Sequence, residues 1–99
     1  MKKPKLASEV DAFRIEILPS AEKDLDRLPV EVQERTFLRI DSLALNPRPN
    51  GVAKLKSKLN SYRIRIGSYR VVYRIVLTPK RIVIESVRHR KDVYRDRGI

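Results

Sequence analysis

The first half of the chain combines one alternating segment with two segments of helical period. Residues 12–18, AFRIEIL, alternate apolar and charged side chains, which predicts a half-buried strand. After Pro19, apolar residues recur at spacings of three and four, as in an amphipathic helix with Ser20 as N-cap. Pro29 ends this helix and can begin a second helix over residues 30–45. The apolar stripes of the two helices are predicted to contain Ala21, Leu25 and Leu28 in the first and Phe37, Leu38, Ile40, Leu43, Ala44 and Leu45 in the second.

After the breaker at residues 46–51, NPRPNG, the period of the sequence changes to two. Alternation is weak over residues 52–59, which predicts a short strand or a structured loop. It is strong in three further segments: YRIRI at residues 62–66, YRVVYRIVL at 69–77 and RIVIESVR at 81–88. Short turns at residues 67–68 and 78–80 join these segments and predict an antiparallel meander. Residues 92–97 are predicted to form a short C-terminal helix or turn.

This order of elements is typical of the α+β class: an N-terminal strand, a two-helix hairpin and an antiparallel β-meander with the helices on one face. Because one helix pair covers only one face of a sheet, the apolar side of each strand must face the helices. We therefore expect Tyr62, Ile64, Val71 and Tyr73 to pack beneath the helices. The arginines at the alternate positions would then project together from the exposed face as a basic platform, formed by Arg63, Arg65, Arg70 and Arg74.

Charge is distributed unevenly along the 99 residues, whose formal net charge is +11. Residues 1–50 hold nine basic and nine acidic side chains, whereas residues 51–99 hold fourteen basic side chains against Glu85, Asp92 and Asp96. The net charge thus lies in the meander half, which predicts a polyanionic partner. Solubilising faces usually mix both signs of charge, so a merely solvated sheet face is the less favoured interpretation.

Composition limits the other possibilities. Residues 1–11 are interpreted as a flexible tail and residues 12–99 as one domain, since a chain of this length can bury one modest core. The chain has no cysteine, which excludes disulfides and is compatible with a reducing cytoplasm, where we expect the protein to act. No apolar run approaches the roughly 20 residues that cross a membrane. Since the sequence has no metal-ligand pattern, glycine-rich phosphate loop or serine triad, no metal or cofactor is expected.

Several side chains of the basic half are candidates for contact with a polyanion or for proton transfer. Lys54, Lys56 and Lys58 recur at strand spacing, either as phosphate contacts or as the lysines that protect an edge strand from aggregation. His89, the single histidine, stands in the run VRHRKDVYR, and an imidazole can transfer protons near neutral pH. Tyr94 can donate a phenolic proton or pack against the sheet edge.

Two motifs of the basic half resemble the RelE toxins of bacterial and archaeal toxin–antitoxin systems. They are YRIRIGSYRVVYRI at residues 62–75 and VRHRKDVYR at residues 87–95, and the helical segment LPSAEKDLDRLPVEVQERTFLRIDSL is similar to the helix hairpin of that family. The resemblance spans residues 12–96. It implies a ribosome-dependent mRNA endonuclease, or interferase, in which the mRNA 2′-hydroxyl attacks the adjacent phosphate in the ribosomal A site. It also implies a cognate RelB-like antitoxin, which the net charge predicts to be acidic.

Carried over residue by residue, the resemblance and the candidate residues above give this catalytic set: Arg63, Arg65, Arg70, Arg90, Tyr94 and His89. Further RNA contacts are expected from Lys54, Lys56, Lys58, Arg74 and Arg88. The family's last-strand arginine corresponds to Arg88 or Arg90. Well-studied members have lysine where this chain has Arg63 and Arg65, and arginine stays charged, so it stabilises a transition state but cannot act as a general base. That role would pass to His89, Tyr94, Lys54 or Lys56, or the reaction would depend on electrostatics and positioning alone.

Two other functions are compatible with the same residues. One is a ParE-like toxin that inhibits DNA gyrase on the same fold, and the other is a non-catalytic RNA-binding module. The presence of Tyr94 together with Arg63, Arg65 and Arg70 favours the interferase.

Overall fold

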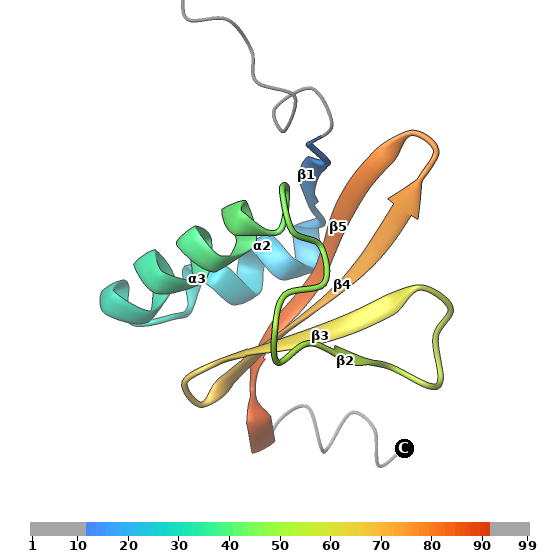
Figure 1. Ribbon diagram of the computed structural model, residues 1–99. Coiled ribbons are helices and arrows are strands. Elements are labelled where there is room, and N and C mark those ends of the chain that lie inside the picture. Colours follow the sequence, from blue (N-terminus) through green and yellow to red (C-terminus); the bar gives the residue numbers. More distant parts are fainter. Residues whose placement is uncertain (1–11, 92–99) are drawn as a thin grey trace, which may run out of the picture.

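A five-stranded sheet and two helices make up the fold, which is described for residues 12–91 of a computed structural model (Figure 1). The elements follow in the order β1 (Arg14–Ile17), α2 (Pro19–Asp26), α3 (Val30–Ser42), β2 (Ala53–Lys54), β3 (Ser61–Ile66), β4 (Tyr69–Leu77) and β5 (Lys80–His89). The predicted α+β class and the β-meander are confirmed. The predicted tail at residues 1–11 and the predicted C-terminal turn at residues 92–97 lie outside the described residues.

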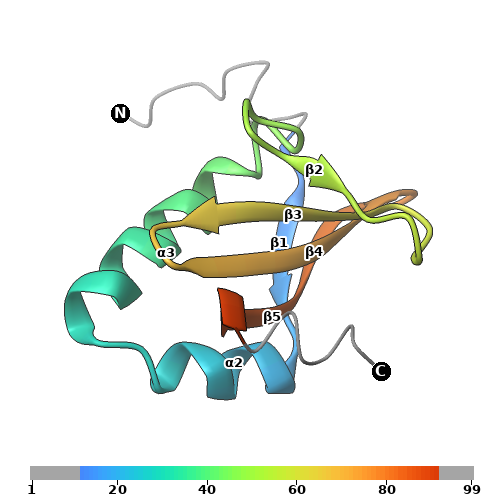
Figure 2. The same ribbon diagram turned by 90° about the horizontal axis from the view of Figure 1, so that it is seen from below.

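The sheet is mixed, with the strand order β1-β5-β4-β3-β2. Strands β2 to β5 pair antiparallel, and β2, β3 and β4 run side by side in Figure 2, whereas β1 pairs parallel with β5. The first strand thus covers one edge of the last strand of the meander. Residues 52–59 form the two-residue strand β2 followed by turns, in agreement with their weak alternation.

Helix α2 completes the edge of β5 where β1 ends, because β1 reaches only as far as Ile84. The Val87 N–H donates to Asp24 Oδ2 over 2.9 Å, and the Ser20 hydroxyl donates to the Glu85 carbonyl over 3.0 Å. The prediction of Ser20 as an N-cap is wrong, because the helix begins one residue earlier and Ser20 lies within its first turn. Leu18 is the N-cap, without a side-chain hydrogen bond, and Pro19 begins the helix.

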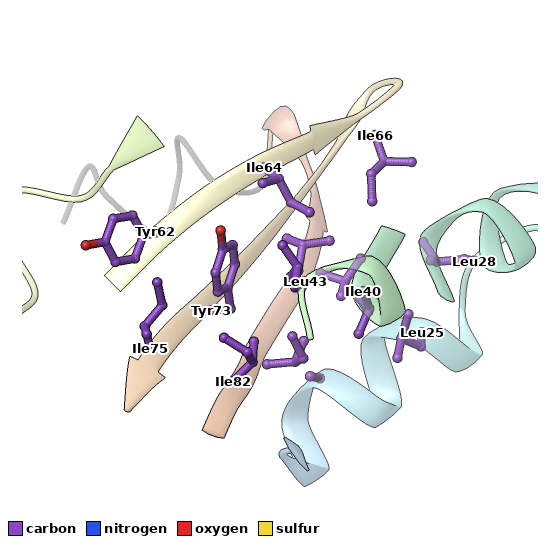
Figure 3. Packing of buried hydrophobic residues seen from close by; sticks show 14 residues of the cluster. Leu25, Leu28, Ile40, Leu43, Tyr62, Ile64, Ile66, Tyr73, Ile75 and Ile82 are labelled. Atoms are coloured by element: carbon purple, nitrogen blue, oxygen red, sulfur yellow. The ribbon is translucent and has the colours of Figure 1, made fainter. Parts of the chain in front are cut away.

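The hydrophobic core lies between the helices and one face of the sheet (Figure 3). As predicted, the apolar sides of β3 and β4 are buried there, together with one stripe of each helix. The buried cluster includes Leu25, Leu28, Ile40 and Leu43 of the helical half and Tyr62, Ile64, Val71, Tyr73 and Ile82 of the sheet. The arginines at alternate positions of β3 and β4 consequently belong to the opposite face.

The buried stripe of α3 is narrower than predicted. It follows Thr36 and Ile40 and continues to Leu43, a spacing of four and three that defines one side of a helix. Leu38 and Leu45 were expected in this stripe but are 70% and 60% exposed, and Phe37 is 40% exposed. Thr36 takes a core position because its hydroxyl donates to the Val32 carbonyl over 2.7 Å, which satisfies the polar group inside the helix.

Two tyrosines connect the breaker at residues 46–51 to the sheet. Tyr73 is fully buried, and its hydroxyl donates to the Pro47 carbonyl over 2.5 Å. Tyr62 stacks on Tyr73 with ring centroids 6.0 Å apart, and the Arg48 guanidinium lies 5.3 Å from the Tyr62 ring centroid. Arg48 Nε also donates to the Tyr62 hydroxyl over 3.2 Å. These contacts hold the proline-rich segment against the core-facing side of the meander.

Replacing Tyr73 by phenylalanine is expected to lower the free energy of unfolding by about 1–2 kcal/mol at neutral pH, because the Pro47 carbonyl loses its donor. Burial raises the pKa of Tyr73 from 10.0 to about 12, so the folded state favours the neutral phenol. This contribution is fully present below pH 10 and is lost as the pH rises through 12. Denaturant unfolding of both proteins across that range measures the effect. An identical alkaline loss of stability in the variant would contradict the assignment.

Candidate nucleic-acid interface on the sheet

Three arginines form one cross-strand row on the sheet face away from the helices. Arg65 of β3 pairs with Arg70 of β4, which in turn pairs with Arg88 of β5. Directly opposite residues of antiparallel strands have Cβ atoms about 5 Å apart, so like charges at such positions repel one another. Since this repulsion is relieved by an anion, the row, called the arginine row below, is a candidate phosphate site.

The members of the arginine row differ in exposure. Arg65 is exposed and the Arg88 side chain is 38% exposed, but Arg70 is only 5% exposed. The expectation that Arg70 faces solvent is therefore wrong, although its face is the predicted one. Arg70 lies on a central strand, where the side chains of both neighbouring strands shield it. Arg70 is thus the buried centre of the row, with the more exposed Arg65 and Arg88 on the flanking strands.

Two more arginines of the predicted platform lie in the adjacent rows of the same face. Arg63 pairs with Val72, which pairs with Ser86, and Arg63 is partly exposed. Arg74 is exposed and pairs with Ser61. The face that carries Arg63, Arg74 and the arginine row is called the basic face below. Alternation along β3 and β4 predicted four of its members but not Arg88 of β5, and the strand register places all five in three neighbouring rows.

Two carboxylates contact arginines of the basic face. The half-buried Asp24 of α2 has Oδ2 3.8 Å from Arg88 Nε, and the same oxygen accepts the Val87 N–H. Glu85 has Oε2 3.8 Å from Arg74 Nε. Sequence reasoning missed both, because Asp24 belongs to a helix far along the chain. Glu85 could have been noticed as the one acidic residue between Asp41 and Asp92.

The three lysines at alternate positions, Lys54, Lys56 and Lys58, do not lie on one strand. Lys54 pairs with the core-facing Tyr62, so it lies on the opposite side of the sheet edge from Arg63. Lys56 follows in a turn and is exposed. Lys58 reaches the basic face, where its Nζ is 3.7 Å from Glu85 Oε1. Of the three, only Lys58 has a contact on the basic face.

The segment after Arg88 turns away from the arginine row. His89 pairs with Tyr69, and its ring meets the Tyr69 ring edge-on at 5.4 Å, on the side of the sheet that carries the core. Arg90 is exposed, begins a helical segment and donates its backbone N–H to the Ser68 carbonyl over 2.9 Å. Arg88 rather than Arg90 therefore joins the row. Tyr94 lies outside the described residues.

The described part of the chain holds no group of three histidine, cysteine or acidic side chains placed to bind a metal ion. None of the helices within residues 12–91 is long and apolar enough to cross a membrane. The arginines of the basic face supply fixed positive charge and hydrogen-bond donors.

Known proteins share both the sequence and the fold. The family described as ParE toxin of the type II toxin–antitoxin system parDE matches residues 15–94. RelE1 of Methanocaldococcus jannaschii is 31% identical over 87 residues, which cover 85% of this chain and 97% of that protein. The toxin RelE3 of the same organism is 36% identical over 76 residues, which cover 73% of this chain and 84% of that protein.

The crystal structure of the archaeal RelE–RelB complex from Pyrococcus horikoshii OT3 contains a similar fold. The TM-score is 0.71 at 31% identity, and the match covers 80% of this chain and 96% of the other. The family match includes the strands of the basic face, and the relatives agree over most of their lengths. The chain belongs to the RelE/ParE superfamily, the toxins of type II toxin–antitoxin systems.

Proposed function

We propose that this toxin is a ribosome-dependent mRNA endonuclease that inhibits translation by cutting mRNA in the ribosomal A site. The observation that carries the proposal is the arginine row, in which Arg65, Arg70 and Arg88 occupy directly adjacent positions on three strands. Three adjacent guanidiniums suit a phosphate group, which can accept several charge-assisted hydrogen bonds at once.

The proposed reaction is attack of the mRNA 2′-hydroxyl on the adjacent phosphorus. The new bond from the 2′-oxygen to phosphorus forms as the bond to the 5′-oxygen breaks, which leaves a 2′,3′-cyclic phosphate and a 5′-hydroxyl. Negative charge grows on the phosphoryl oxygens, and the fixed guanidiniums of Arg65, Arg70 and Arg88 stabilise it. Arg63 in the next row adds to this positive field.

Proton transfer requires a group other than arginine, since a guanidinium stays protonated. The leading candidates are His89 and Tyr94, with Lys54 of β2 and Lys56 of the following turn as the alternatives. The register places His89 on the other side of the sheet from the arginine row, which favours Tyr94 for this role. Tyr94→Phe keeps the ring and removes the hydroxyl, so its rate in the cleavage assay tests the phenol alone.

The deciding experiment maps cuts on a defined mRNA with and without ribosomes. We expect cuts within the reading frame only when ribosomes are present, because the ribosome orients a substrate for a site that has no strong base. Primer extension locates the cuts, and the terminal phosphate identifies the chemistry. Intact mRNA in both reactions, with a protein that still binds RNA, would support the non-catalytic RNA-binding module instead.

A second candidate function is inhibition of DNA gyrase, which the match to the ParE family favours. The same fold serves both activities, so the site must decide between them. Gyrase supercoiling assayed beside mRNA cleavage separates the two: a ParE-like toxin stops supercoiling and leaves mRNA intact. The arginine row, with its affinity for phosphate, favours the interferase.

The proposed partners are the ribosome with its mRNA and a RelB-like antitoxin. The Pyrococcus relative was crystallised with RelB. Because this chain has a net charge of +11, we expect its antitoxin to be acidic and to cover part of the basic face.

A further inference from the structure

Glu85 is the single acidic residue of strands β3, β4 and β5. It occupies an irregularity of the ladder: Val72 pairs with Ser86 and Tyr73 pairs with Ile84, so Glu85 has no residue opposite it on β4. An inserted residue of this kind redirects its side chain relative to the regular alternation. Here the carboxylate is directed to the basic face, where it contacts Arg74.

Two cations enclose the Glu85 carboxylate. Lys58 Nζ lies 3.7 Å from Oε1, and Arg74 Nε lies 3.8 Å from Oε2. The Glu85 side chain is 19% exposed, whereas the side chains of Lys58 and Arg74 are 60% and 45% exposed. Oε1 is buried and accepts no hydrogen bond from the described residues. The carboxylate therefore lies beneath the two cations, which form its outer cover.

This arrangement commits Lys58 and Arg74 to Glu85. A buried carboxylate oxygen without a hydrogen bond is costly unless positive charge lies close to it. If a phosphate drew the two cations away, the carboxylate would lose that compensation. It would also repel the phosphate directly, because both groups are negative. Lys58 and Arg74 thus present less attraction to RNA than their exposure indicates.

The arginine row lies beyond the reach of this effect. Glu85 precedes Arg88 by three residues on β5, a separation of about 10 Å along an extended strand. Arg70 and Arg65 lie on the same row as Arg88, one and two strands further across the sheet respectively. The basic face is therefore divided along its length: at one end Glu85 lies beneath Lys58 and Arg74, and at the other end three arginines are adjacent and Asp24 contacts one of them, Arg88.

We propose that Glu85 is a specificity-determining residue that keeps RNA phosphates off the Lys58–Arg74 end and confines the RNA backbone to the arginine row. The inference rests on the proposed function as an RNA-cutting toxin. It removes Lys58 and Arg74 from the RNA contacts expected from the sequence, and it assigns the single carboxylate of these strands a role in setting the position of the substrate.

The test is RNA binding by Glu85→Gln, which keeps the size of the side chain and removes its charge. The probe is a short 2′-O-methylated single-stranded RNA, which has no nucleophile and cannot be cut. We expect binding about threefold to tenfold tighter at low salt. Each phosphate newly bound adds about 0.7 to the slope of log K against log salt, so the slope should steepen by about 1.4 for the two released cations.

Two comparisons make the result specific. Glu34→Gln changes the net charge equally at an exposed position of α3, on the other side of the sheet, and should bind RNA like the wild type. The double variant Glu85→Gln with Arg74→Gln restores the wild-type net charge and should lose about half of the added salt slope, because one of the two released cations is removed. Thermal unfolding of each variant verifies the fold.

Equal or weaker RNA binding by Glu85→Gln would overturn the proposal, as would an equal gain in Glu34→Gln, which would indicate a general effect of net charge. Because the probe cannot be cut, these outcomes are independent of the proposed endonuclease activity. If the wild type fails to cut ribosome-bound mRNA, the proposed function fails while the binding comparison still reports on Glu85. In a cleaving protein, Glu85→Gln should also cut at additional neighbouring positions.

Discussion

Replacing Arg70 by alanine is expected to lower the rate of ribosome-dependent mRNA cleavage about a hundredfold to a thousandfold. One preorganised donor at a developing negative charge stabilises the transition state by roughly 3–4 kcal/mol in a water-excluded site. Arg70 meets this description because it is only 5% exposed and lies between Arg65 and Arg88. Single-turnover cleavage of mRNA on saturating ribosomes measures the chemical step separately from binding.

Two further variants separate a lost charge from a lost fold. Arg70→Lys keeps a charge but not the planar fork of donors, so its rate should lie between those of the wild type and Arg70→Ala. Arg35→Ala removes the same charge from an exposed position of α3 and should cut at the wild-type rate. A folded Arg70→Ala protein that cuts mRNA as fast as the wild type would show that the arginine row is not the reaction site.

The strands and their faces could be predicted because alternation leaves little freedom in this meander. Turns as short as residues 67–68 impose antiparallel pairing, and a shift by one residue would bury Arg63 and expose Ile64. The parallel pairing of β1 with β5 was not predictable in the same way. It joins segments more than 60 residues apart, and the alternation of residues 12–18 says only that one face is buried.

Two predictions for the helical half are wrong, the width of the apolar stripe of α3 and the N-cap of α2, and each has a physical reason. Helical periodicity predicts a core position for every leucine near the apolar stripe. Leu38 and Leu45 are nevertheless exposed, while Thr36 is buried. A threonine can be satisfied by the helix's own backbone, so its polarity does not exclude it from the core. Ser20 is not the N-cap because helix α2 begins one residue earlier, at Pro19, and its hydroxyl donates to a strand carbonyl.

The candidate site was predicted by face but not by position within that face. Sequence alternation groups Arg63, Arg65, Arg70 and Arg74, but only the register shows that Arg65, Arg70 and Arg88 share a row. Arg70 is buried because it lies on a central strand of the sheet. Arg74 contacts a carboxylate because the ladder irregularity directs Glu85 to the basic face. Both depend on neighbours across the sheet, which a single strand sequence does not report.

Association with the cognate antitoxin is expected to slow by about one to two orders of magnitude as ionic strength rises from low to high. The net charge of +11 comes entirely from residues 51–99, so an acidic partner is steered toward one half of the toxin. Dissociation should respond less to salt, because apolar anchors of the antitoxin determine how long the complex lasts. Stopped-flow mixing of the toxin with its RelB-like antitoxin, across a salt series, measures both rates.

The Glu85→Gln and Arg70→Ala proteins serve as matched comparisons in this experiment, since one gains and the other loses a unit of positive charge on the same face. Steering depends on the summed field and not on individual contacts, so both changes should shift the association rate by less than about threefold, in opposite directions. Their effects on RNA binding and cleavage are expected to be larger, because those depend on which phosphate meets which cation. An antitoxin association rate that does not change with ionic strength would contradict steering and would restrict the role of the asymmetric charge to RNA or ribosome binding.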